Sequence, residues 1–94
     1  MISLEFIGTI EDTAKVVKDE NGAPTAFTFI VDVTSYGKDK EGKTKARTKR
    51  IFCKRKGACA AITRFVGGQN IYVQGSLDVK GKDFYCEVWR FELV

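Results

Sequence analysis

The centre of the sequence carries a dense cluster of positive charge. Ten Lys and Arg residues lie between Lys38 and Lys56 against only Asp39 and Glu41, so this stretch has a charge of +8 while the rest of the chain carries −4. Local positive potential of this kind attracts polyanions, above all the phosphate backbone of a nucleic acid. A solvated Lys-rich hairpin is the alternative interpretation.

Three of these cations alternate along a predicted strand. Lys45, Arg47 and Lys49 are separated by small or polar residues, so their side chains share one face at intervals of about 6.6–6.8 Å. This interval is close to the phosphate repeat of an extended nucleic-acid backbone, which predicts a row of phosphate contacts. Protection of an edge strand by Lys is the structural alternative.

Aromatic rings near the basic stretch are candidates for stacking on bases. Tyr36 is the first candidate, followed by Phe52, Tyr72 and Tyr85, each of which could equally lie in a core or a dimer interface. Trp89 shares strand parity with Tyr85, Phe91 and Leu93, which favours packing in the core or in a dimer interface. The predicted nucleic-acid-binding residues are Tyr36, Lys43, Lys45, Arg47, Lys49, Arg50, Phe52, Lys54, Arg55, Lys56, Tyr72, Lys80, Lys82 and Tyr85.

The residues give little support for catalysis, metal binding or membrane association. The chain has no His, no Gly-rich phosphate loop ahead of its helix and no nucleophile beside an obvious base, so an enzyme is not expected. Cys53, Cys59 and Cys86 fit no common zinc spacing and predict reduced, buried thiols, with no metal and no cofactor. Residues 1–10 alternate instead of forming a signal sequence, and no apolar run reaches membrane-spanning length. We therefore expect a cytoplasmic protein without a membrane partner.

The periodicity of the apolar residues predicts five strands and one helix. Strand one covers 2–10, with a bend or bulge at Gly8, and continues through 14–17. Strands two and three cover 25–35 and 44–54, joined by a long flexible loop at 36–43. A helix is expected over 57–66, where Ala58, Ala61, Ile62 and Phe65 recur at helical spacing before Gly67-Gly68. Strands four and five cover 70–79 and 84–93, joined by a hairpin at 80–83.

This order of elements predicts the fold class. Three strands, a helix and two strands are expected of an all-β OB-fold, a five-stranded Greek-key barrel with one short helix between strands 3 and 4. Ninety-four residues suffice for one core, so residues 1–94 are predicted to form a single domain. An SH3-like barrel or a small sandwich would contain similar elements.

The chain also resembles the bacterial single-stranded DNA-binding protein family, including the tail-less primosomal replication protein N. The resemblance rests on the opening residues 4–10, the 21–24 turn, Ile51-Phe52-Cys53, and above all the stretch from Phe65 to Leu77. It implies an OB-fold that dimerises, often through its first strand, and that binds single-stranded DNA without a sequence code. Single-stranded RNA is the runner-up ligand.

Two departures from the family qualify that expectation. Housekeeping members have a long Gly-rich tail that recruits replication and repair enzymes, whereas this sequence stops at Leu93-Val94, which favours an accessory, plasmid, phage or primosome-type role. At the family's stacking positions only Tyr36 keeps a ring, so binding should depend mainly on backbone electrostatics. A module that docks an acidic replication protein is the alternative from another functional class.

Overall fold

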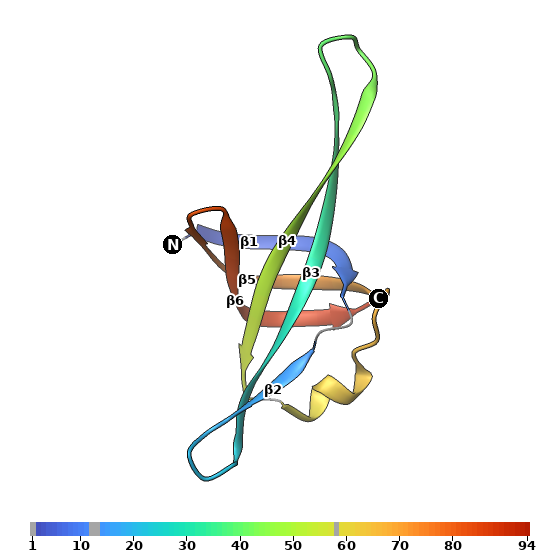
Figure 1. The fold of residues 1–94 in the computed structure, drawn as a ribbon. Coiled ribbons are helices and arrows are strands. Elements are labelled where there is room, and N and C mark those ends of the chain that lie inside the picture. The colour runs from blue at the N-terminus through green and yellow to red at the C-terminus, as the bar shows by residue number, and fades with distance from the viewer. Residues whose placement is uncertain (1, 12–13, 58) are drawn as a thin grey trace.

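Six strands form one closed β-sheet in the computed structural model, which describes residues 2–11, 14–57 and 59–94. The strand order is β1-β5-β6-β4-β3-β2, and β1 pairs a second time with β3, which closes the barrel (Figure 1). Strands β4 and β6 run parallel, and the other paired strands run antiparallel. The elements are β1 (Ile2–Ile10), β2 (Lys15–Lys18), β3 (Pro24–Lys38), β4 (Thr44–Lys56), η1 (Cys59–Arg64), β5 (Asn70–Lys80) and β6 (Asp83–Leu93).

The barrel closes where Gly8 interrupts the alternation of β1. Strand β1 pairs with β5 along its length and then with β3 through Thr9 and Ile10. A Cβ at Gly8 would lie 2.5 Å from the carbonyl oxygen of Asp32, so only glycine allows the two backbones to cross here. The expected single first strand is divided, because β1 ends at Ile10 and β2 pairs only with β3. The predicted run through Ala14 is therefore wrong.

The core is built from the period-two residues of the strands. Phe27, Phe29 and Val31 are fully buried, and residues of β1, β4, β5 and β6 complete the cluster. Phe65, which follows η1, packs edge-on against Phe27 and Phe29 with ring centroids 5.4 and 4.9 Å apart. The helix is where the sequence predicted it, but it is a 3-10 helix limited to Cys59–Arg64. Ala58, part of the predicted helical pattern, lies outside the described residues.

The cysteines agree in part with the expected buried thiols. Cys53 and Cys86 are buried side by side, since they are register partners in the parallel β4–β6 pair. A hydrogen bond with Cys86, together with burial, raises the pKa of the Cys53 thiol. Cys59 in η1 is half-buried, and all three thiols are free. The thiol pair therefore belongs to the packed core.

The most extended feature is the β3–β4 hairpin. The sequence predicted a flexible loop at 36–43, but strand pairing continues as far as Lys38 and Thr44. The Asp39 carboxylate closes the short remaining loop by accepting the backbone N–H groups of Glu41 and Lys43, each at 2.9 Å. Residues 34–49, here called the arm, are all exposed to solvent. The arm projects from the barrel (Figure 1) and gives the molecule a longest dimension of 57 Å.

A β-bulge in β6 changes the side-chain alternation of that strand. Gln74 pairs with Arg90 and Gly75 pairs with Val88, which leaves Trp89 as the extra residue. Trp89 does not pack in the barrel core, because the bulge turns it outward with 48% of its surface exposed while Phe91 and Leu93 pack on the core. Packing of Trp89 in a dimer interface stays a prediction. In the described part of the chain, no helix is long and apolar enough to cross a membrane.

Candidate nucleic-acid interface

Strand β4 sorts the central cations onto two faces. Ile51 and Cys53 point into the barrel, so Lys45, Arg47 and Lys49 share their side of the β3–β4 ribbon. The intervening positions, from Arg50 through Phe52 and Lys54, face outward. Two adjacent side chains show the division directly: the Lys49 ammonium lies 5.7 Å from the ring centroid of Phe84, whereas Arg50 reaches in the other direction to Glu11.

The outer face of the barrel presents a pair of stacked rings. Phe52 and Tyr85 are register partners in β4 and β6, with ring centroids 5.4 Å apart and planes inclined by 26°. Tyr85 is 39% exposed, and the Lys80 ammonium lies 5.6 Å from its ring centroid. The rings border a hollow of about 440 Å³ on the barrel surface. We call this surface the aromatic groove; it is formed by Lys15, Thr28, Ile30, Phe52, Lys54 and Tyr85.

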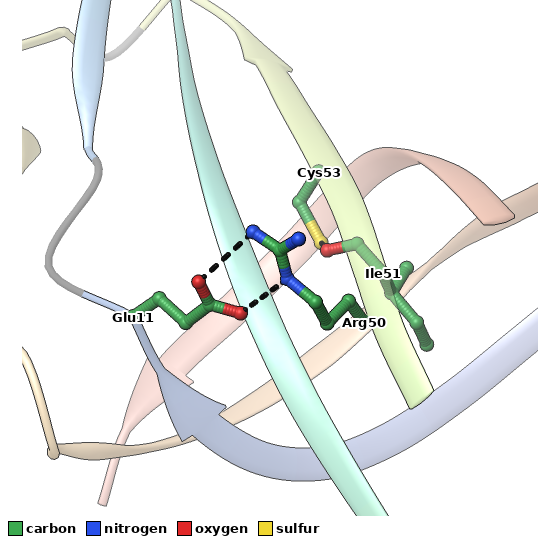
Figure 2. Close-up of polar contacts among 4 residues, drawn as sticks. All are labelled: Glu11, Arg50, Ile51 and Cys53. Carbon is green, nitrogen blue, oxygen red and sulfur yellow. Dashed lines mark hydrogen bonds and ion pairs between the residues drawn. The ribbon is translucent and has the colours of Figure 1, made fainter. Parts of the chain in front are cut away.

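Acidic residues neutralise part of the outer face. The Arg50 side chain crosses β3 and donates two hydrogen bonds to the Glu11 carboxylate, at 2.7 and 3.1 Å (Figure 2). This contact holds the pKa of Glu11 below its usual range and raises the pKa of Arg50. Desolvation and the neighbouring Glu11 raise the pKa of Asp32, the register partner of Arg50. Arg50 is thus paired with an acidic side chain and is less available than a free cation for contact with a phosphate.

The opposite face of the arm has cations without that neutralisation. Lys45, Arg47 and Lys49, here called the arm rail, are exposed, and their register partners are Gly37, Ser35 and Val33. Within residues 2–11, 14–57 and 59–94, no ion pair joins any member of the rail. A hollow of about 600 Å³ adjoins the rail near the arm tip, bordered by Lys45 and Arg47 together with residues 35–40. The predicted alternation of the three cations is therefore present on an accessible surface.

Several other predicted residues are engaged in contacts within the protein. The Arg55 guanidinium donates to the backbone carbonyls of Val88 and Trp89, and so provides hydrogen-bond donors for the carbonyl groups at the bulge in β6. Lys56 lies 3.5 Å from the Glu87 carboxylate, and Lys43 lies 3.9 Å from Glu41.

Tyr72 is on a different part of the barrel. Its hydroxyl donates to the Glu5 carboxylate, and this contact raises the pKa of Tyr72. Its register partners are Ile7 in β1 and Glu92 in β6, so the ring lies in an acidic neighbourhood. Tyr36 is 74% exposed on the arm. Lys80, the last residue of β5, lies by the Tyr85 ring, and Lys82 is in the β5–β6 turn.

The structure adds residues that the sequence did not single out. Lys15 borders the aromatic groove because β2 pairs with β3 at Thr28. Lys38 and Lys40 border the hollow at the arm tip. Their place in the basic stretch is the available signal. The position of Lys38 at the end of a paired strand is not apparent from the sequence, because 36–43 has the composition of a loop.

Comparisons with known proteins bear on the fold. No protein-family model matches the chain, and no curated protein matches it in sequence. Among solved structures, a small single-stranded DNA-binding protein from Streptomyces coelicolor is similar, with a TM-score of 0.76 and 20% identity over 99% of this chain and 92% of that one. The protein PriB from Ralstonia solanacearum matches with a TM-score of 0.70 and 14% identity over 99% and 97% of the two chains.

A third similar structure contains nucleic acid. The Plasmodium falciparum SSB complex with ssDNA matches with a TM-score of 0.73 and 16% identity, over 100% of this chain and 93% of that one. The fold that the resemblance in the sequence implies is therefore confirmed. At these identities the likeness establishes the fold alone, which is an OB-fold barrel.

Proposed function

We propose that this protein binds single-stranded DNA without sequence specificity and has no catalytic activity. The observation that carries the proposal is the aromatic groove: an open pair of stacked rings on the outer barrel face, with Lys15, Lys54 and Lys80 around it. Aromatic platforms flanked by cations bind unpaired bases, because every base offers a face for stacking while its phosphates are neutralised. Stacked bases of a duplex cannot reach such a platform.

The similar structures favour DNA over RNA as the ligand. The proteins from Streptomyces coelicolor and Plasmodium falciparum are described as single-stranded DNA-binding, and the latter was solved with its ligand. A role in replication, recombination or repair, including a primosome, fits the same likeness. The expected homodimer and the expected cytoplasmic location stay predictions. The free edge of β1 along residues 2–8, which pairs on one side with β5, is a surface on which a second copy could add.

The test is a fluorescence-anisotropy titration of a labelled oligo-dT, with unlabelled duplex DNA and oligo-U as competitors. We expect oligo-dT to bind, and unlabelled duplex to compete at least about tenfold more weakly than unlabelled oligo-dT, since only unpaired bases can stack on the rings. Oligo-U reports the preference between DNA and RNA. Equal competition by duplex and single strand would contradict the proposal, and failure of oligo-dT to bind at low salt would favour a protein-docking module.

A further inference from the structure

The arm has two exposed faces that differ in chemistry. The outer face leads to the aromatic groove, where rings and acidic residues accompany the cations. The other face carries the arm rail, whose register partners are uncharged. A β-ribbon separates the two sets of side chains, and in Figure 1 the arm stands clear of the barrel. Two polyanion-binding surfaces are therefore available on one molecule.

The two surfaces fit different parts of a nucleic acid. The aromatic groove requires unpaired bases, because its rings act by stacking. The arm rail presents Lys45, Arg47 and Lys49 at two-residue intervals, which suits the regularly spaced charges of a phosphodiester backbone. Such contacts read neither base identity nor pairing state, so the rail accepts a backbone from single-stranded or duplex nucleic acid.

One short strand cannot occupy both surfaces at once. Lys49 and Arg50 are neighbours in the chain, yet their side chains lie on opposite sides of the ribbon, against Phe84 and Glu11 respectively. Beyond them, pairing continues through Lys38 and Thr44, so a strand in the groove would reach the rail only by passing round an arm several residues long. The rail remains free when a short oligonucleotide fills the groove.

From this separation we propose that one molecule holds two nucleic-acid segments together. The unpaired bases of one segment lie in the aromatic groove, and the phosphodiester backbone of a second lies along the arm rail. The inference rests on the proposed binding function and adds an activity, the bridging of two strands. The backbone on the rail is that of a second single strand or of a duplex, and the experiment separates these sources.

The experiment is a fluorescence-transfer assay between two short oligonucleotides, a donor-labelled oligo-dT and an acceptor-labelled second molecule that is either oligo-dT or a duplex. Wild-type protein should bring donor and acceptor together in at least one of these arms. The double variant K45Q/R47Q should lose most of that transfer, at least about fivefold, because two phosphate contacts are removed from a three-cation surface. Its direct binding of donor oligo-dT should fall by a smaller factor.

A matched control keeps the net charge equal. The double variant A46E/T48E lowers the charge by the same two units on the same strand, but on the opposite face of the arm. We expect it to retain bridging better than K45Q/R47Q. Equal loss in both variants would overturn the inference, because only total charge would then matter.

Two further outcomes are distinguishable. Bridging that survives in K45Q/R47Q and disappears in Y85L would mean that two copies join through two grooves, which also overturns the inference. Absence of any oligo-dT binding by the wild-type protein would instead refute the proposed function itself. Circular dichroism of each variant would confirm that the β-sheet is intact.

Discussion

Removing the ring of Tyr85 is the most direct perturbation of the aromatic groove. Tyr85 is 39% exposed and stacks on Phe52, which lies deeper against the barrel. The two rings thus form one platform for one base, with Tyr85 as its accessible part. Y85L keeps an apolar, though shorter, side chain while removing the flat face on which a base would lie.

The expected loss follows from the value of one stacked base. Base–aromatic stacking contributes about 1–3 kcal/mol, which corresponds to a rise in Kd of roughly 5- to 150-fold. F52L should raise the Kd by a smaller factor, because the Phe52 ring acts mainly by supporting Tyr85. The double variant should cost less than the sum of the single changes, since contacting residues that act as a unit are not additive.

Anisotropy titrations of oligo-dT at fixed salt would measure these losses. Y85F keeps the ring and should bind within about twofold of wild type, as a stacking role requires. Y72L removes a comparable ring from the acidic side of the barrel and serves as the matched control, with little expected effect. If Y85L bound as well as Y72L, or if Y85F were as weak as Y85L, stacking in the groove would be refuted.

Three further predictions concern charge, pH and backbone packing. A single strand long enough to pass round the arm can contact both the groove and the rail. With about five phosphates neutralised, log Kd against log salt for such a strand should have a slope magnitude near 3.5, falling by about 1.4 in K45Q/R47Q, as titrations at several salt concentrations would show. The folded-state pKa of Glu11 is lowered, so its stabilising contribution is present above about pH 4.3 and is lost as the pH falls through the folded value. Urea unfolding at several pH values should show a weaker acid dependence in E11Q. G75A would place a Cβ 2.2 Å from a backbone carbonyl and should destabilise by about 1–3 kcal/mol in urea unfolding, whereas G37A meets no atom within 4 Å.

Each of these has an outcome that contradicts it. A salt slope unchanged in K45Q/R47Q would mean that the rail carries no phosphate contact. Identical pH profiles for wild type and E11Q would show that the ion pair with Arg50 does not contribute to folding. Equal stability of G75A and G37A would show that the strands beside the bulge are not closely packed.

Much of the barrel could be predicted because its strands have clear local patterns. Phe27, Phe29 and Val31 alternate in β3 and are buried, and Gly8 marks the place where β1 crosses β3. The order of strands and helix then restricted the topology. Element bounds were less predictable at 36–43, where polar residues and two glycines indicated a loop, although ladder hydrogen bonds extend the hairpin without any apolar face.

The candidate site was harder to predict because it depends on pairing between distant segments. The alternation of Lys45, Arg47 and Lys49 is visible in the sequence, but the neutralisation of Arg50 by Glu11, 39 positions away, is not. The bulge at Trp89 shifts the side-chain alternation of β6. Alternation in the sequence alone therefore assigns Trp89 to the same face as Phe91 and Leu93, although it faces outward. Arg55 has the sequence context of a free cation, but its guanidinium donates to backbone carbonyls at that bulge. The sequence does not show this contact, because it depends on the position of the bulge.

The long arm also has a consequence for local stability. Its backbone hydrogen bonds between β3 and β4 lie outside the apolar core, so breaking them exposes little buried surface. The free energy of local opening should therefore decrease from the barrel toward Asp39 at the tip, independently of global unfolding. Amide hydrogen exchange would then be fastest in the arm of the free protein, and a bound strand would slow it there first.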